Sequence, residues 1–424
     1  MEEGRALGHP VSVEEARAII EAQFIAGGLS GDGGPADARP REETIEIRRA
    51  AGRVLARAVD AREDIPPFAN SAMDGYAVHS DDIRSIPARV EVVGESRTGT
   101  PPPDTVSRGS CVRIMTGAPM PPGCDAVVPV EWTQGWIESG AVIVTNAVER
   151  GMNVRTAGGD VTAGSRVFEA GDAVTPPVVG MLAAMGFARV NVYRRPTVAI
   201  VASGDELVSD GSRLGPGQIR NSNGPGLAAQ ARWVGADVVL ETVAGDEEDA
   251  VRAAISRGLE ADILLISGGV SVGLYDYVRG ALEAESVSIL FWRVQQRPGR
   301  PLAFGRSATA AAFGLPGNPV SSAICFEQYV KPAIRIFQGG SARAPLVDAV
   351  LDERVEKKVG LHYFSRGKSW LDDDGTRRVH LAGEQGSNIY SSMVRSNCIV
   401  HLPAERGEVS RGETVGIEPY AWSA

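Results

Sequence analysis

The 424-residue chain has few of the features that mark membrane, secreted or zinc-binding proteins. No apolar run approaches the length of about 20 residues that a membrane helix needs, so we expect no membrane role. Cysteine is scarce, and neither paired nor metal-ligand spacing occurs among Cys111, Cys124, Cys325 and Cys398. The stretch MEEGRALGHP has no basic and apolar signal pattern, which together with the scattered cysteines predicts a cytoplasmic protein with buried free thiols.

Positive charge and histidine are also limited. The net charge is −10 and there is no basic tract, which argues against nucleic-acid binding. The five histidines, His9, His79, His362, His380 and His401, lie far in sequence from the glycine-rich loops, so a Ser-His-Asp system has no local support. An anionic ligand would need cationic groups close by, because salt screens charges beyond roughly 8 Å.

The remaining composition is that of a globular protein with several domains. Hydrophobic residues make up 43% and charged residues 23%, and the length exceeds that of one ordinary core. Residues 12–26 predict a helix with a capping box, and residues 44–146 predict mainly β structure. Strands and helices alternate over residues 197–337, which is typical of a doubly wound, mostly parallel sheet. Short strands after residue 340 predict a small C-terminal β-barrel or sandwich.

Two glycine-rich loops each follow a predicted strand and precede a predicted helix. They read ISGGVSVGLYDYV (266–278) and GLPGNPVSS (314–322), the latter with Ser321 or Ser322 as helix cap. Converging backbone N–H groups at a helix start bind anions, so the pair predicts an extended site for a nucleotide-like ligand with several phosphates. For the first loop, glycine that merely permits a tight turn is the alternative. The residues concerned are Gly268, Gly269, Ser271, Pro316, Gly317, Asn318 and Ser321.

Acidic residues follow three strands of the same predicted sheet. Glu206, Asp246 and Asp276 come after the first, second and third strand ends. Carboxylates that meet at one edge repel each other unless a cation joins them, and Mg²⁺ prefers oxygen ligands. The sequence therefore predicts a magnesium site formed by these acids, while a plain helix-start role stays open for each of them and above all for Asp246.

Arginines cluster around a Pro-Gly turn in WRVQQRPGRPLAFG. Arg293, Arg297 and Arg300 carry the planar donor fork that suits phosphate or oxyanions, and a solvated surface strand is the alternative. In the β-rich half, Asp74 precedes Gly75 and on its own indicates only a turn. Thr116 stands before Gly117 in a strand-turn-strand pattern.

Taken together, these stretches resemble the molybdopterin molybdenumtransferase family, of the MoeA and gephyrin E-domain type. The motifs PPFANSAMDGYAV, RIMTGAPMPPGCDAVV, ASGDEL, GGVSVGLYDY, RPGRPLAFG and GLPGNPVS occur in family order and cover nearly the whole chain. The resemblance implies an α/β multidomain fold with four domains. These are a linking domain (1–46 with 148–193), an elongated β-rich domain (47–147), a doubly wound molybdopterin-binding domain of the MogA type (194–340) and a C-terminal β-barrel (341–424).

The resemblance also implies a reaction. Molybdenum from molybdate would be transferred to the dithiolene of adenylylated molybdopterin, with Mg²⁺ required and AMP released. The implied homodimer joins the doubly wound domain of one subunit to the β-rich domain of the other, so that Asp74 and Thr116 act with Glu206, Asp246 and Asp276. Arg366 and Ser387 match family positions associated with oxyanion binding. The adenylyltransferase and recipient molybdoenzymes are the further partners implied.

Two departures and two alternatives remain. The family often has lysine where this chain has Arg293, Arg297 and Arg300, and many relatives have Asp where Ala69 stands. A peptide-binding scaffold of the gephyrin type is one alternative, but the chain lacks that protein's fused adenylyltransferase unit and long linker. A molybdopterin adenylyltransferase is the other, but single-domain members lack the SAMDGYAV and MTGAP segments. The sequence does not distinguish molybdate from tungstate.

Overall fold

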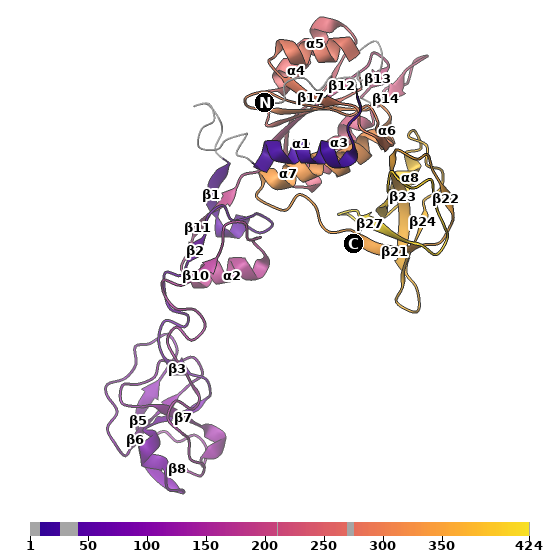
Figure 1. The fold of residues 1–424 in the computed structure, drawn as a ribbon. Coiled ribbons are helices and arrows are strands. Elements are labelled where there is room, and N and C mark those ends of the chain that lie inside the picture. The colour runs from indigo at the N-terminus through magenta and orange to yellow at the C-terminus, as the bar shows by residue number, and fades with distance from the viewer. Residues whose placement is uncertain (1–8, 26–40, 210, 269–274, 424) are drawn as a thin grey trace, which may run out of the picture. The chain divides into compact units, whose positions relative to one another are not determined.

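The chain folds into two compact units, Met1–Glu43 with Tyr193–Ala424 and Thr44–Val192 (Figure 1). The computed structural model describes residues 9–25, 41–209, 211–268 and 275–423, except the side chains of Tyr275 and Asp276. Among these residues, no helix combines the length and the apolarity that crossing a bilayer requires.

A six-stranded sheet forms the centre of the larger unit, in the order β15-β12-β16-β20-β19-β17. Its first four strands run parallel, and β19 and β17 are antiparallel to their neighbours. The predicted mostly parallel sheet is thereby confirmed. The strands are β12 (Thr197–Ser203), β15 (Asp237–Ala244), β16 (Ile263–Ser267), β17 (Ser288–Trp292), β19 (Ala303–Arg306) and β20 (Ala311–Leu315), and a parallel pair, β13 (Leu207–Val208) and β14 (Ile219–Arg220), follows β12.

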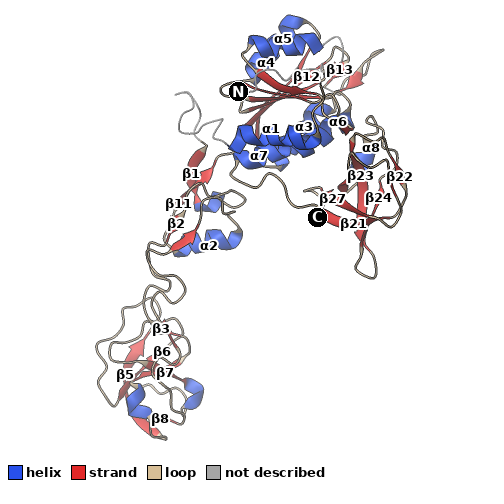
Figure 2. Cartoon of the chain, viewed as in Figure 1, coloured by secondary structure: helices blue, strands red, loops and turns tan. Residues whose placement is uncertain are grey.

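Helices cover both faces of this sheet (Figure 2). Alternate residues of the strands point to opposite sides, so Val198 and Ile200 pack in one core and Ala199 and Val201 in the other. The first core holds α1 (Val13–Ile25), α3 (Asn223–Trp233), α6 (Pro319–Cys325), the π-helix η4 (Phe326–Val330) and α7 (Lys331–Phe337). The second holds α4 (Glu248–Gly258) and α5 (Tyr275–Ala284).

The first helix begins with the predicted capping box. The backbone N–H of Glu15 donates to Ser12 Oγ at 3.1 Å, and the N–H of Ser12 donates to a Glu15 carboxylate oxygen at 2.9 Å. Its buried residues Val13, Ala16, Ile20 and Phe24 lie in the core of the doubly wound sheet. The sequence-based boundaries group this helix with residues 148–193 instead. The domain boundaries remain a proposal, but α1 packs on the sheet domain and not on residues 148–193.

The C-terminal part closes into a five-stranded barrel, as predicted. Its strands run in the order β23-β24-β21-β27-β25, and pairing of β25 with β23 closes the ring. They are β21 (Val347–Leu351), β23 (His362–Leu371), β24 (Arg377–Leu381), β25 (Cys398–Leu402) and β27 (Thr414–Pro419), accompanied by β22 (Val355–Glu356), β26 (Glu408–Val409) and α8 (Ser391–Arg395). The pair β18 (Gln296–Arg297) and β23 joins the barrel to the sheet domain.

The smaller unit is rich in β structure and has two main cores. One lies in the five-stranded sheet β7-β4-β6-β5-β8, and the other lies beneath α2 (Pro176–Ala184). The first sheet comprises β4 (Gly75–Val78), β5 (Ala88–Ser96), β6 (Ser110–Ile114), β7 (Ala126–Pro129) and β8 (Gly140–Val144). Short pairs are β1 (Glu42–Glu46) with β11 (Arg189–Tyr193), β2 (Val59–Asp60) with β10 (Arg166–Phe168), and β3 (Asn70–Ser71) with β9 (Val154–Arg155); 3₁₀ turns are η1 (Ile47–Arg49), η2 (Ser80–Ile83) and η3 (Val130–Trp132).

Candidate functional site

A cavity of about 530 Å³ lies at the carboxyl edge of the six-stranded sheet. It is lined by Ser203 and Ser267, the last residues of β12 and β16, and by the loop that follows β20. β12 is the first of these strands in sequence, with β15 on one side of it and β16 on the other, so the strand order reverses here. Such a switch point leaves a crevice between diverging loops, where open α/β sheets bind ligands.

Backbone groups give this cavity the character of an anion site. Two helices begin at it, α3 at Asn223 and α6 at Pro319, with Asn318 as the residue before α6. Helix starts carry partial positive charge and unpaired N–H groups. Gly268 has a φ of 93°, and a Cβ there would lie 2.6 Å from the carbonyl oxygen of Ser203, so this position requires glycine. Of the predicted loop residues, Gly268, Pro316, Gly317 and Asn318 line the cavity.

Two of the three predicted acids line the same cavity. Glu206 is exposed, and its carboxylate lies against Gly204, where an added Cβ would be 2.4 Å from Oε2. Asp246 is half-buried; its N–H donates to Asp205 Oδ1 at 3.0 Å, and its own Oδ1 lies 3.5 Å from Ser203 Oγ. The acidic loops after β12 and β15 are therefore tied together.

Two of the three predicted magnesium ligands, Glu206 and Asp246, line the cavity. No group of three or more His, Cys, Asp or Glu side chains suited to a metal occurs in the part of the chain that the structure describes. The side chain of Asp276, like Gly269 and Ser271, lies outside that part. Mg²⁺ commonly takes one or two carboxylates and fills its shell with phosphate oxygens and water, so Glu206 and Asp246 suffice as protein ligands.

The predicted arginine cluster does not line the cavity. The side chains of Arg293, Arg297 and Arg300 are exposed. Of this segment, Pro301, the residue after Arg300, lines the cavity. The guanidinium of Arg297 lies over the ring of Tyr363, 5.5 Å from its centroid. A cation among the lining residues is instead Arg220, which the sequence analysis missed; its guanidinium donates to the carbonyl oxygen of Ser212.

Arg366 is a buried framework residue that holds a barrel loop. Its side chain is 1% exposed, and burial lowers its pKa to about 10. Nε donates to Ser392 Oγ at 3.0 Å, and Nη2 donates to the carbonyl oxygens of Glu384 and Gly386 at 3.3 and 3.1 Å. These bonds fix the backbone of residues 383–388, the loop that carries Ser387.

Ser387 brings that barrel loop to the cavity wall. Its Oγ accepts a hydrogen bond of 3.0 Å from Asn318 Nδ2, and its carbonyl oxygen accepts one of 3.2 Å from the N–H of Val320. The structure therefore brings Asn318 and Ser387 together. The prediction that Ser321 or Ser322 caps α6 is wrong, because Pro319 already begins the helix and both serines are buried inside it.

In the smaller unit, Asp74 and Thr116 form a hydrogen-bonded pair. The N–H and the hydroxyl of Thr116 both donate to Asp74 Oδ1, at 2.7 and 2.8 Å. These two bonds lower the pKa of Asp74, so its exposed carboxyl is ionised at neutral pH. Glycine is required at the next position, because a Cβ on Gly75 would lie 1.9 Å from the carbonyl oxygen of Val128.

Several lining residues were not predicted, among them Ser203, Arg220, Asn221, Asn223, Ser267 and Pro301. Asn223 connects two of the loops that line the cavity. Its Nδ2 donates to Ser267 Oγ and to the carbonyl oxygen of Gly317, both at 2.8 Å. The stretch RNSNG (220–224), within which α3 begins, carried a signal, since Asn and Ser are favoured at helix starts.

Comparisons with known proteins agree along the chain. Residues 11–186 match the model of the MoeA N-terminal region (domain I and II), residues 199–336 that of a probable molybdopterin binding domain, and residues 348–420 that of the MoeA C-terminal region (domain IV). The chain is 37% identical to the molybdopterin molybdenumtransferase of Haemophilus influenzae, covering 89% of this chain and 94% of that protein. The chain belongs to the molybdopterin molybdenumtransferase family.

Other members of this family and solved structures give the same result. Molybdopterin molybdenumtransferase 2 of Mycobacterium tuberculosis is 35% identical over 88% of this chain and 93% of its own length. The crystal structure of the molybdopterin biosynthesis MoeA protein from Pyrococcus horikoshii superposes with a TM-score of 0.83 at 26% identity, covering 98% of this chain and 100% of that one. The chain is thus a transferase of molybdenum cofactor biosynthesis, and the predicted multidomain α/β fold is confirmed.

Proposed function

We propose that this protein transfers molybdenum from molybdate to the dithiolene of adenylylated molybdopterin and releases AMP in a Mg²⁺-dependent reaction. The cavity at the switch point of the sheet is the observation that carries the proposal. It combines the carboxylates of Glu206 and Asp246 with two helix starts and a backbone loop that requires glycine at 268. That combination suits a ligand whose phosphates are bridged by a cation.

The roles of the chain's own residues follow from this arrangement. The partial positive charge at the starts of α3 and α6 attracts phosphate oxygens to the cavity and orients the bridge that must break. Glu206 and Asp246, with Asp276 as a third proposed ligand, hold the cation. Mg²⁺, when bound, supplies charge neutralisation and polarises the phosphate bridge. Ser387 and Arg366 belong to the barrel loop at the cavity wall, Arg366 by holding that loop in place.

The acting form is proposed to be a cytoplasmic homodimer. In this proposal the Asp74–Thr116 pair of one subunit faces the cavity of the other and supplies an ionised carboxylate next to the substrate. Light scattering of the active enzyme is expected to give twice the mass of the 44.6 kDa chain. An active, purely monomeric enzyme would rule out the shared cleft.

AMP release measures the reaction directly. Purified protein is incubated with adenylylated molybdopterin, with or without Mg²⁺, and with molybdate or tungstate. We expect AMP only when Mg²⁺ is present, and a rate lowered by about 10²-fold in Asp246→Asn and in Asp276→Asn, the loss typical of removing one electrostatic contact in a closed site. Undiminished release by Asp246→Asn would remove that residue from the site.

A matched control lies at the other end of β15, the strand that precedes Asp246. Asp237 begins β15 at the end opposite Asp246, so Asp237→Asn changes one exposed carboxylate outside the cavity and is expected to keep the wild-type rate. The adenylyltransferase alternative predicts a different result. In that case the protein would consume ATP with molybdopterin and release pyrophosphate, and it would not release AMP from the adenylylated substrate.

A further inference from the structure

Asn223 ties together the loops on either side of the switch point. It is the first residue of α3 and lines the cavity. Its Nδ2 donates at 2.8 Å to Ser267 Oγ at the end of β16 and at 2.8 Å to the carbonyl oxygen of Gly317 after β20. Because a carbonyl oxygen can only accept, the amide nitrogen, and not Oδ1, must face Gly317.

The second of these bonds bears on anion binding. Gly317 lines the cavity, and a carbonyl oxygen without a donor would present partial negative charge to a phosphate. The Asn223 amide satisfies that oxygen and fixes the loop in the conformation that leaves the start of α6 facing the cavity. The adjacent Gly268 has its own N–H bonded to the carbonyl oxygen of Leu315 at 3.3 Å, so both loops share one hydrogen-bonded frame.

We infer that Asn223 is a positioning residue for the substrate's phosphates. It acts through Gly317 and Ser267, and keeps the cavity wall arranged for an anion before the anion arrives. This inference rests on the proposed function, since it assigns the cavity to a phosphate-bearing substrate. Preorganised donors are effective because the site need not rearrange when charge enters.

Substitution by aspartate separates this role from a merely structural one. Asn223→Asp keeps the side-chain volume and places a carboxylate in the first turn of α3, where negative charge stabilises a helix. This gain offsets part of the loss of the two Asn223-donated bonds, so the free energy of unfolding is expected to fall less than in Asn223→Ala. The carboxylate cannot donate to Gly317 and adds negative charge to the cavity, so anion affinity is expected to fall at the same time.

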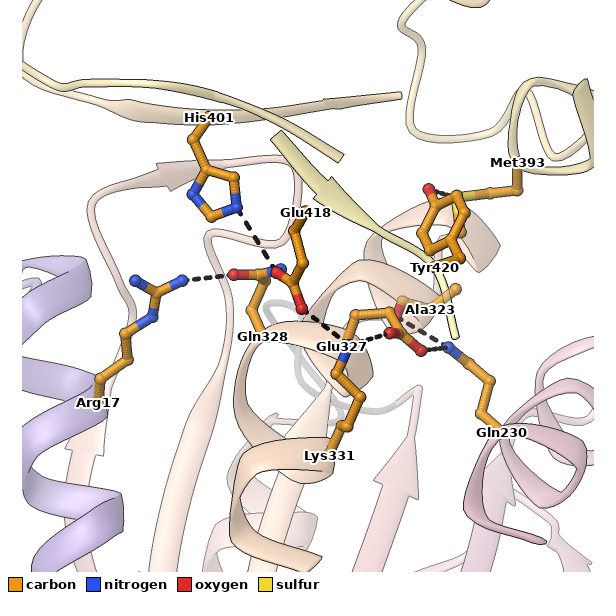
Figure 3. A network of polar contacts seen from close by, with 10 residues as sticks. All are labelled: Arg17, Gln230, Ala323, Glu327, Gln328, Lys331, Met393, His401, Glu418 and Tyr420. Atoms are coloured by element: carbon orange, nitrogen blue, oxygen red, sulfur yellow. Dashed lines mark hydrogen bonds and ion pairs between the residues drawn. The ribbon is translucent and has the colours of Figure 1, made fainter. Parts of the chain in front are cut away.

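A control for general loosening of α3 is available two turns along the same helix. Gln230 Nε2 donates to Glu327 Oε1 at 2.7 Å and to the carbonyl oxygen of Ala323 at 3.3 Å, which ties α3 to η4 and α6 (Figure 3). None of these three residues lines the cavity. Gln230→Ala thus removes two amide-donated bonds between α3 and its neighbours without touching the site. It should lower stability and leave anion affinity unchanged.

Calorimetric titration of the full chain with AMP in the presence of Mg²⁺ tests the inference. We expect the Kd for AMP to rise at least about tenfold in Asn223→Asp and about tenfold in Asn223→Ala, the scale of losing one hydrogen bond, and to stay within about twofold in Gln230→Ala. The KM for adenylylated molybdopterin should rise in parallel. Should Asn223→Asp fail to fold, Asn223→Ser carries the same prediction in weaker form.

Each outcome decides something. Equal AMP affinity in the wild type and both Asn223 variants overturns the inference, as does an equal loss in Gln230→Ala or no AMP binding by the wild type. If the wild type binds AMP, the Asn223 variants lose it, and yet no AMP is released from the adenylylated substrate, the proposed function fails while the positioning role of Asn223 stands.

Discussion

Residues 319–337 form one helical stretch, and charged side chains near its two ends differ in how they are paired. At its start, α6 lies at the cavity lined by Glu206 and Asp246, and within the described residues neither carboxylate forms an ion pair with a cationic side chain. Further along, a buried network surrounds Lys331, which lies 2.7 Å from Glu327 and 2.8 Å from Glu418 (Figure 3). Charged side chains thus pair with one another in the buried network, whereas the carboxylates at the cavity are left to pair with a ligand.

In the buried network, ion pairing opposes the effect of burial on the pKa values. The side chains of Glu327 and Lys331 are 0% and 4% exposed. Burial alone would raise the pKa of Glu418, but His401, Lys331 and Gln328 hold it well below its usual value. Burial alone would likewise lower the pKa of Lys331, and Glu327 with Glu418 raise it. The buried charges are therefore part of the folded framework, whereas the cavity carboxylates can bind a cation that also contacts phosphates.

Removing the central cation of the buried network should have the largest effect on stability. Lys331→Met leaves Glu327 and Glu418 buried without their partner, which is expected to cost about 3–5 kcal/mol in the free energy of unfolding. Urea denaturation measures it. Combining Lys331→Met with Glu327→Gln and Glu418→Gln should recover most of the loss.

An exposed ion pair provides the matched control. Arg411 and Asp352 are 72% and 31% exposed and 2.8 Å apart. Arg411→Ala is expected to cost less than about 1 kcal/mol. If it costs as much as Lys331→Met, burial is not what distinguishes the two pairs.

Arg366 should show an intermediate effect, because it is buried like the network but holds a loop at the cavity. Arg366→Met removes the donor to Ser392 and to two carbonyl oxygens, at an expected cost of about 2–3 kcal/mol. Since the loop carries Ser387, AMP release should fall as well, measured at a temperature where the variant is folded. A loss of stability with an unchanged rate would separate the loop from the site.

The loss of folding stability at acidic pH should come in part from the histidines beside the buried network. Burial, and next the proximity of His401, lower the pKa of His362 from 6.5 to about 3. The unfolded chain binds a proton there below pH 6.5 and the folded chain does not, so stability is present above pH 6.5 and is lost as pH falls toward 3. His362→Phe is expected to reduce the loss between pH 7 and pH 5 by up to about 2 kcal/mol. His380→Phe, at an exposed site, is the control, and an equal effect there would contradict this cause.

The smallest effect is expected at the Asp74–Thr116 pair. Thr116→Val removes the hydroxyl donor but keeps the backbone N–H, so the pKa of Asp74 should rise part of the way to its ordinary value. Titration by carboxyl NMR measures the shift, with little change in unfolding. Thr145→Val, which affects no carboxylate bond, should leave the titration unchanged.

The sequence predicted the sheet and the loops that end its strands, because buried strands and glycine-rich turns are local patterns. It therefore placed Glu206, Asp246 and Gly317 correctly at one cavity. The arginines were less predictable, since side-chain direction depends on tertiary packing: Arg297 lies over Tyr363, and Arg220 lines the cavity instead. The network was missed because Lys331 and Glu418 are 87 residues apart and meet only after the barrel docks.

The central claim is that the cavity carboxylates serve the reaction and the buried network serves the fold. Comparing AMP release with urea unfolding in two variants tests this claim most directly. Asp246→Asn, which changes the cavity, should keep the urea midpoint of the wild type and lose about 10²-fold in rate. The repaired network variant, Lys331→Met with Glu327→Gln and Glu418→Gln, should release AMP at close to the wild-type rate. Wild-type release by Asp246→Asn, together with loss of release in the folded network variant, would contradict the account.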